Sequence, residues 1–314
     1  MTNVAGVDIG SNTVSCVVLD EFGAVVSYDV TVAGLGRAVA LSGSLAGPDI
    51  ERTLGVLGAV RATISDQGLN WDDDVDVVAT AACRVADNAT EFLDRAEAVL
   101  GRRPRVIDGD EEARLGFSGA TGGLDVAASG LDDPRVAVLD IGGGSTEISI
   151  GRLGHTPDRT VSLPVGAVQM RMTHLLHDPA HPDELTNAIG LAYDHLDDAV
   201  RTIPELLDRV AMIGVAGTVV TAATVEIGLH TWDEERVHGF ELTRAAAEDV
   251  FRTLATEPIE DRRFNPGLPA DRADVIVGGM CVLVAVMRRL ALPTITVSTR
   301  GLSHGVALAL RERR

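Results

Sequence analysis

Short apolar runs separated by turn residues dominate the first part of the chain. Residues 4–9 (VAGVDI), 14–20 (VSCVVLD) and 24–32 (AVVSYDVTV) are rich in Val, which is typical of β-strands. From 48 to 67, apolar residues recur at helical spacing, and Pro48 stands where it favours the first turn of a helix. We therefore predict three strands followed by a helix.

The alternation of strands and helices continues to the C-terminus. Helices are predicted at 89–100, 111–124, 243–257 and 271–290, within a helix-rich stretch at 166–209, and at the end of the chain. Strands are predicted at 75–80 and 104–108, on both sides of a Gly turn within 135–153, at the start of 209–225, and after residue 294. This alternation predicts an α/β fold.

One short pattern occurs twice, each time between two predicted strands. Residues 7–13 read VDIGSNT and residues 139–146 read LDIGGGST, which indicates an internal duplication. The length of 314 residues also suggests two domains. We therefore predict duplicated domains at 1–130 and 131–314 with a cleft between them, and a C-terminal helix that packs back on the first domain.

The charged residues exclude several classes of binding site and catalytic mechanism. A formal net charge of −19 argues against nonspecific nucleic-acid binding. All 27 basic residues are Arg, which excludes a P-loop lysine and a Schiff base. An anionic substrate would have to be held by Arg, by backbone N–H groups or by a metal ion.

The hydropathy pattern predicts a cytoplasmic protein without a membrane partner. The longest apolar run, at 275–287, is too short to cross a bilayer. Asp8 interrupts the first apolar stretch, so we expect no signal peptide.

The cysteine and histidine spacings do not favour a metal site. The three cysteines are far apart in apolar contexts and are predicted to be buried free thiols: Cys16, Cys83 and Cys281. His174, His177 and His181 have an H-x₂-H-x₃-H spacing, but Pro179 interrupts the segment and no Cys is near. We interpret these histidines as a solvated helix end.

The two Gly turns could bind phosphate. Each turn leads into a strand rather than a helix, which distinguishes it from a P-loop or a Rossmann turn. Glycines let the backbone approach a bulky anion, and backbone N–H groups could form a concave anion site. Asp8 and Asp140 end their strands, where they could hold Mg²⁺ or could cap the turns.

A third loop, GVAGTVVTAA at 214–223, has similar character. Its Gly217 and Thr218 open a helix after a strand, so they could bind phosphate at the helix N-terminus or form an ordinary turn. The phosphate-binding candidates of the three loops are Ser11, Asn12, Thr13, Gly142, Gly143, Gly144, Ser145, Thr146, Gly217 and Thr218.

DIGSNT, DIGGGSTE and GVAGTVVTAA together resemble the phosphate-1, phosphate-2 and third-loop motifs of the actin, sugar-kinase and Hsp70 superfamily. More closely, the chain resembles the short, two-domain members of the exopolyphosphatase and guanosine pentaphosphate phosphohydrolase (Ppx/GppA) family. The resemblance implies two duplicated actin-like (ribonuclease H-like) domains. The stretches that carry it are 79–101, 108–120, 138–151, 162–168 and 269–279.

The resemblance also implies catalytic roles. Glu112, directly before Ala-Arg-Leu, matches the family's catalytic base, although alone it would be read as an acid that complements a helix dipole. Glu147 matches a carboxylate that orients the water or binds the metal, and otherwise is a strand residue. Arg84 matches an arginine that faces the phosphates, where its guanidinium could bind two oxygens, and otherwise forms a surface ion pair.

Two departures from the family pattern leave the substrate open. Near the C-terminus, Ser303 and His304 in GLSHG replace residues that could contact an anion. After Gly166, the family often has Val-Arg, whereas this chain has Val168 and Gln169, with an arginine two positions later.

The resemblance implies an exopolyphosphatase that uses Mg²⁺, or Mn²⁺ instead, and acts by direct water attack, since no G-x-S-x-G nucleophile motif is present. The alternatives are a guanosine pentaphosphate (pppGpp) 5′-phosphohydrolase, a noncatalytic (p)ppGpp-binding regulator, and an actin-like ATPase or sugar kinase. An aromatic content of 3% offers few base-stacking platforms and leans towards polyphosphate over guanosine polyphosphate. A homodimer is expected.

Overall fold

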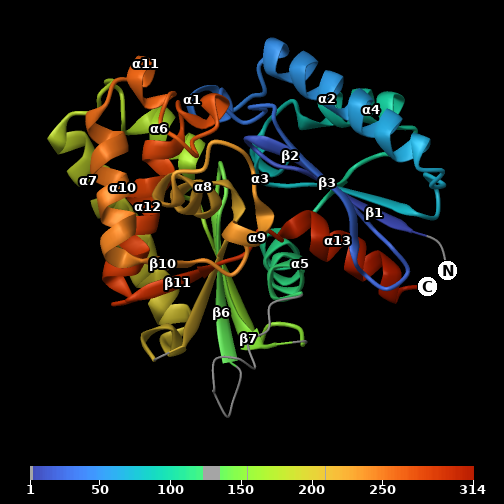
Figure 1. Ribbon diagram of the computed structural model, residues 1–314. Helices are drawn as coiled ribbons and strands as arrows, with labels where there is room; N and C mark the ends of the chain where they lie inside the picture. The colour runs from blue at the N-terminus through green and yellow to red at the C-terminus, as the bar shows by residue number, and fades with distance from the viewer. Residues whose placement is uncertain (1–2, 123–134, 154, 209) are drawn as a thin grey trace. The chain divides into compact units, whose positions relative to one another are not determined.

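A computed structural model describes residues 3–122, 135–153, 155–208 and 210–314. The chain forms two compact units, Met1–Gly119 with Leu302–Arg314, and Ala120–Gly301 (Figure 1). They are called unit 1 and unit 2 below, and each is described by itself. The predicted domain boundary after residue 130 lies outside the described residues.

Unit 1 contains a mixed sheet with the order β3-β2-β1-β4-β5. β1 to β3 are antiparallel neighbours, and β4 and β5 continue the sheet parallel to β1. The three apolar N-terminal runs form the predicted strands because Val and Ile suit a pleated, half-buried surface. The strands are β1 (Val4–Ile9), β2 (Thr13–Leu19), β3 (Val25–Val32), β4 (Val75–Ala79) and β5 (Arg105–Val106).

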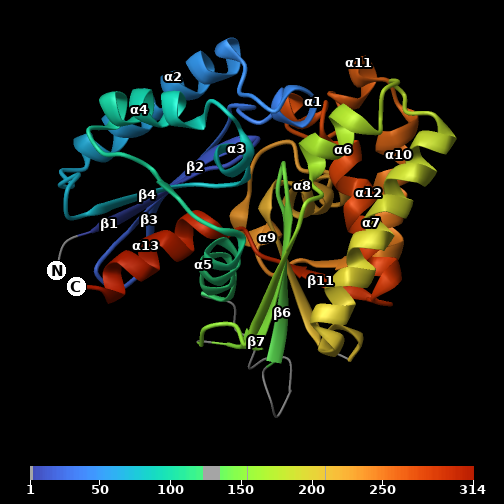
Figure 2. The ribbon, with the colours of Figure 1, turned by 180° about the vertical axis from the view of Figure 1, so that it is seen from behind.

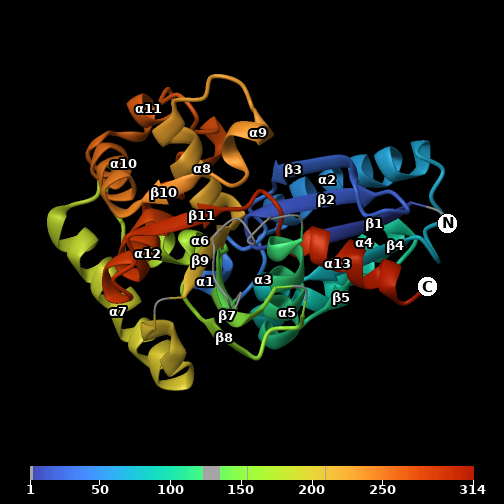
Figure 3. The same cartoon turned by 60° about the horizontal axis from the view of Figure 1, so that its bottom comes forward.

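Helices cover both faces of this sheet (Figures 2 and 3). Successive side chains of a strand point to opposite faces. Accordingly, Val7 packs in the core beneath α2 and α4, while Val4 packs with Ala307 of α13 on the other face. The helices are α1 (Val39–Ser42), α2 (Gly47–Asp66), α3 (Ala81–Val85), α4 (Ala89–Leu100), α5 (Gly109–Thr121, which ends in unit 2) and α13 (Leu302–Glu312).

Unit 2 contains a second mixed sheet with the order β10-β11-β9-β6-β7-β8. Its two edge strands, β8 and β10, have no counterpart in the sequence-based prediction. The strands are β6 (Arg135–Ile141), β7 (Thr146–Arg152), β8 (Arg159–Leu163), β9 (Ala211–Val215), β10 (Glu241–Thr243) and β11 (Thr294–Val297).

α12 (Ile276–Arg289) is the central helix of unit 2, and every residue from Ile276 to Met287 is buried. α7 (Pro182–Thr202) and α10 (Arg244–Thr256) lie beside it (Figure 2). Among the described helices, none combines the length and apolar character needed to cross a membrane. The remaining helices are α6 (Ala167–Thr173), α8 (Ala216–Ile227), α9 (Glu234–Val237), α11 (Ile259–Arg262) and the 3₁₀ turns η2 (Pro204–Leu207) and η3 (Ala270–Arg272).

The predicted start of α12 at residue 271 is wrong by five residues, since the helix begins at Ile276. The backbone N–H groups of Arg272 and Val275 donate to carbonyls three positions earlier, at Pro269 and Arg272. This is 3₁₀ rather than α-helical bonding. The apolar periodicity therefore begins in a turn that precedes the helix.

The two sheets repeat one another. From one edge to the other, the strand order β3-β2-β1-β4-β5 corresponds to β8-β7-β6-β9-β11. In both sheets the first two neighbouring pairs are antiparallel and the next two are parallel. The second sheet has one additional edge strand, β10, which is antiparallel to β11. The predicted α/β fold with an internal duplication is therefore confirmed.

Candidate functional site

The two Gly turns have the same backbone geometry. DIGSNTVS from Asp8 and DIGGGSTE from Asp140 align without a gap. In the first turn the N–H of Gly10 donates to the carbonyl of Thr13 at 2.9 Å, and in the second the N–H of Gly142 donates to Ser145 at 3.0 Å. The hairpin type inferred from the sequence is therefore present at equivalent positions of both units.

Each turn is supported by a glycine that sequence reasoning did not select. A Cβ at Gly36 would lie 2.8 Å from Cβ of Ser11, and one at Gly166 would lie 2.6 Å from the carbonyl oxygen of Gly143. The same segments are bonded to the turns, since Gly36 donates to Ser11 and Val168 donates to Gly143. The signal in the sequence that could have identified these glycines is the similarity of GRAV, which follows β3, to GAV, which follows β8.

The acidic residues of the two turns differ. Asp8 lies opposite Ser15 in the β1–β2 register, whereas Asp140 lies opposite Glu147 in the β6–β7 register. Like charges directly opposite one another destabilise an antiparallel pair. A divalent cation would offset this repulsion, and carboxylate oxygens are the ligands that Mg²⁺ and Mn²⁺ prefer. The donor set of Asp140 and Glu147 therefore fits such an ion, and Asp8 offers a further carboxylate in unit 1.

Side-chain hydrogen bonds fix the second turn. Glu147 is only 3% exposed, and its Oε1 accepts a bond of 2.6 Å from the hydroxyl of Ser162 on β8. Thr146 donates its hydroxyl to the carbonyl of Val165 at 2.6 Å. The hydroxyl proton of Thr146 and the N–H of Gly142 are therefore already used, and Gly143, Gly144 and Ser145 remain the better phosphate donors of this turn.

In unit 1, the carboxyl ends of three parallel strands meet beside the first turn. The N–H of Thr80, directly after β4, donates to Ile9, and the N–H of Ile107, directly after β5, donates to Ala79. Sites in α/β sheets commonly form at this edge. α3, which carries Arg84, and α5, which carries Glu112, both begin there.

Local capping positions Glu112. Asp108 precedes α5, and its carboxylate accepts a 2.7 Å bond from the N–H of Glu111, while its carbonyl accepts the N–H of Glu112. The neighbouring Glu111 is directed to Arg105 at 3.0 Å. The two adjacent acids therefore have different partners, and only Glu112 reaches Arg84.

Arg84 and Glu112 form a largely buried pair. Nη1 of Arg84 lies 2.5 Å from Oε2 of Glu112 and 3.0 Å from the carbonyl oxygen of Ile107, and the two side chains are 20% and 11% exposed. Burial raises the pKa of Glu112 above its ordinary value of 4.5, while the Arg84 guanidinium acts in the opposite direction. Sequence reasoning selected both residues but did not place them together.

The third loop begins at the end of β9, which lies beside Asp140 in the sheet through Val215. Ala216 has φ 64°, in the left-handed region, and leads into Gly217. A Cβ at Gly217 would lie 2.0 Å from Nη1 of Arg272. The N-terminal turn of α8 therefore lies against the guanidinium of Arg272. Sequence reasoning did not single out this arginine, although it lies within the stretch 269–279 that carries the family resemblance.

The side chain of Thr218 belongs to the core of unit 2. It is 4% exposed, and a Cβ at Gly279 of α12 would lie 2.3 Å from its hydroxyl oxygen. Gly217 and Thr218 could bind an anion through their backbone N–H groups, because N–H groups in the first turn of a helix have no intrahelical partners.

The departures from the family pattern have structural explanations. His304 is buried and lies against Tyr28, with 4.8 Å between ring centroids, and Ser303 is also buried. The N–H of Gln169 donates to Gly143 at 3.1 Å. Arg171, two positions later, binds Asp274 at 3.2 Å and the carbonyl of Leu175.

Comparisons with known proteins agree with this geometry. The model of the Ppx/GppA phosphatase family matches residues 21–313. Exopolyphosphatase 2 of Mycobacterium tuberculosis is 30% identical over 326 aligned positions, which cover 99% of each chain. A crystal structure of an exopolyphosphatase-like protein is 30% identical, with a TM-score of 0.92 over 99% of both chains.

The crystal structure of the Aquifex aeolicus Ppx/GppA family member is 28% identical, with a TM-score of 0.74, and covers 100% of this chain and 99% of its own. The predicted α/β fold with an internal duplication agrees with these similarities, which extend over nearly the whole chain. With a matching family model over nearly all of its length, the chain belongs to the Ppx/GppA phosphatase family.

Proposed function

We propose that this protein is an exopolyphosphatase that removes the terminal phosphate of inorganic polyphosphate. The observation that carries the proposal is the largely buried Glu112, held against Arg84 at the carboxyl ends of the unit 1 strands. The family is one of phosphatases, and a relative of full length is named exopolyphosphatase 2.

In the proposed reaction, a water molecule attacks the terminal phosphorus and the bridging P–O bond breaks. Glu112 accepts the proton of the water, and the shortened chain leaves with the bridging oxygen. A carboxylate with a raised pKa is a stronger base, and burial raises the pKa of Glu112. If Arg84 binds the phosphoryl oxygens instead of Glu112, it no longer lowers the pKa of Glu112. Substrate binding would therefore make Glu112 a stronger base.

Backbone donors and a metal ion complete the proposed site. Backbone N–H groups of the two Gly turns and of Gly217 and Thr218 would orient the phosphates. In unit 2, Asp140 and Glu147 would hold Mg²⁺, or Mn²⁺ instead, which would neutralise charge on the phosphoryl oxygens, and Asp8 is the carboxylate proposed as a metal ligand in unit 1. Arg272 adds a guanidinium at the third loop.

The proposal predicts that Glu112→Gln abolishes most of the activity. Phosphate release from polyphosphate with Mg²⁺ should fall by about 10²–10⁴-fold, the usual contribution of a general base. The matched control is Glu111→Gln, which makes the same change at the neighbouring residue that binds Arg105. Glu111→Gln should keep most of the activity. Full activity of Glu112→Gln, with folding verified, would remove the assigned role.

A side-by-side substrate panel distinguishes the remaining alternatives. Polyphosphate and pppGpp should be compared by kcat/KM under one set of conditions. A strong preference for pppGpp would assign the same chemistry to nucleotide hydrolysis instead. Tight ppGpp binding without turnover of any phosphate substrate would identify a noncatalytic regulator.

A further inference from the structure

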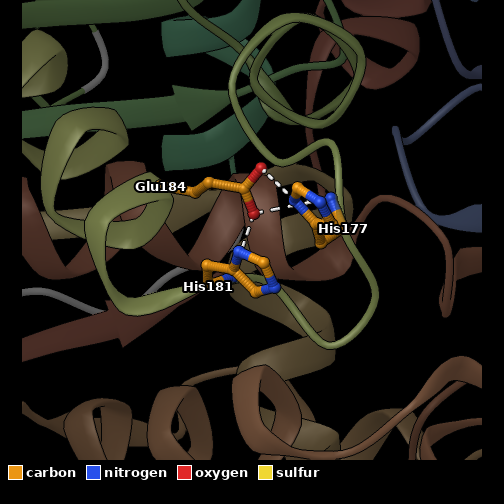
Figure 4. A group of neighbouring side chains, drawn as sticks. All are labelled: His177, His181 and Glu184. Atoms are coloured by element: carbon orange, nitrogen blue, oxygen red, sulfur yellow. Dashed lines mark hydrogen bonds and ion pairs between the residues drawn. The ribbon is translucent and has the colours of Figure 1, made fainter.

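Two histidines and a glutamate converge where the loop after α6 enters α7. His177 lies in the loop, His181 is the N-cap residue of α7, and Glu184 lies in its first turn (Figure 4). One potential ligand atom from each residue lies within 4.8 Å of the other two. We propose that His177, His181 and Glu184 form a surface site for a transition-metal ion of the Zn²⁺ class.

The chemistry of the three side chains fits this class of ion. Two imidazoles and one carboxylate are a common ligand set for Zn²⁺, with water completing the tetrahedron. Nitrogen ligands distinguish the site from the all-carboxylate set proposed for Mg²⁺. His174, the third histidine of the sequence motif, is not part of the cluster, because its Nδ1 lies 2.6 Å from the hydroxyl of Thr173.

Hydrogen bonds from the His177 side chain and from the N–H groups of His181, Leu176 and His177 fix the carboxylate of Glu184 in place. Three of these bonds hold the loop around the carboxylate, at 2.9 Å from His177 Nδ1, 2.9 Å from His181 N and 3.0 Å from Leu176 N.

The two imidazole rings are stacked in parallel. Their centroids lie 3.8 Å apart with an interplanar angle of 12°. The stacking keeps the two rings beside one another, where one ion could contact both. The side chain of His177 is 58% exposed, so an ion can reach its ring from solvent.

The loop is also anchored on its other side. Asp178, between the two histidines, accepts a 2.6 Å bond from the N–H of Ile259 and a 2.7 Å bond from Nη2 of the buried Arg262. Arg262 further binds three backbone carbonyls. The site is therefore preorganised, and an ion would need to draw the ligands together by only a small rearrangement.

The test uses zinc binding to the whole, untagged protein. Isothermal titration with Zn²⁺, with excess Mg²⁺ present to occupy carboxylate sites, should give one site per chain. His177→Ala should weaken binding at least tenfold, as should His181→Asn, in which asparagine preserves the helix cap. His230→Ala removes an exposed histidine outside the cluster and should leave binding unchanged.

A second measurement excludes misfolding as the explanation. Zn²⁺ should raise the Tm of the wild type and of His230→Ala, but not that of the two site variants, each compared with its own Tm without metal. Absence of Zn²⁺ binding by the wild type, or equal binding by the double variant His177→Ala/His181→Asn, would overturn the proposal. Neither outcome depends on whether the protein hydrolyses polyphosphate.

Discussion

At the scale of single residues, the functional chemistry depends on partners rather than on residue types. Glu111 and Glu112 are adjacent acids in one helical turn, yet the first is bound to Arg105 and the second to Arg84. Asp8 and Asp140 occupy equivalent positions of the repeat, yet one faces Ser15 and the other faces Glu147. Unit 2 alone therefore carries the opposed acid pair of the repeat.

The Arg84–Glu112 pair predicts a pH effect. Activity should be lost as pH falls through the pKa of Glu112, which burial places above 4.5. Arg84→Met removes the charge that opposes this effect, so the pKa should rise further and the acid limb of kcat/KM should move to higher pH.

The shape of the pH profile measures this shift independently of the lower kcat/KM that follows from losing a phosphate contact. Arg114→Met changes an exposed arginine on the same helix and should leave the acid limb in place. An acid limb at the same pH in wild type and Arg84→Met would refute the proposed coupling.

At the scale of elements, glycines decide how closely segments approach. In unit 1, a Cβ at Gly6 of β1 would lie 2.2 Å from the carbonyl oxygen of Ser303, and one at Gly305 would lie 1.8 Å from the carbonyl oxygen of Leu115. α13 therefore packs on the strands and on α5 at backbone distance. Gly166 plays the corresponding part beside the second Gly turn.

Gly305→Ala should destabilise unit 1. The new Cβ meets backbone that cannot move aside cheaply, so we expect a loss of about 1–3 kcal/mol in the free energy of unfolding. Gly58→Ala in α2 is the control, because a Cβ there meets nothing within 4 Å. It should gain up to about 1 kcal/mol from helix propensity.

Urea denaturation of both variants provides the measurement. The two changes are chemically identical and both lie in helices, so opposite signs would isolate the packing effect. Equal stabilisation by both would show that α13 does not pack at the distance described.

At the scale of the whole molecule, each unit has its own hydrophobic core, and thiols are buried in both. Cys16 and Cys83 lie in unit 1 and Cys281 lies in unit 2, and all three are free. Burial raises the pKa of each thiol to about 12. The predicted buried thiols are therefore confirmed, and they report on the folding of each unit.

The native protein should be almost inert to a thiol reagent. At pH 8 a pKa of about 12 leaves about one thiol in ten thousand ionised, and only the thiolate reacts. Labelling in rising urea, followed by mass spectrometry, should pass from none to three adducts. An intermediate with two adducts would mean that unit 1 unfolds first, whereas rapid labelling of the native protein would contradict the burial described.

The sequence by itself determined the α/β alternation, the duplication and the position of both Gly turns, because these follow from short-range sterics and from the periodicity of apolar residues. It also placed Glu112 and Arg84 in recognisable motifs. It did not indicate that they pair, since 28 residues separate them and only the order of β4 and β5 in the sheet brings α3 and α5 together.

Only the tertiary structure showed that Gly36 and Gly166 pack against the two Gly turns, and that Arg272 lies beside Gly217 in the third loop. It also brought Glu184, rather than His174, next to His177 and His181, although the sequence spacing grouped the three histidines. The contacts of Gly36, Gly166 and Arg272 join segments that are far apart along the chain and carry no local signal, so they could be recognised only in the folded structure.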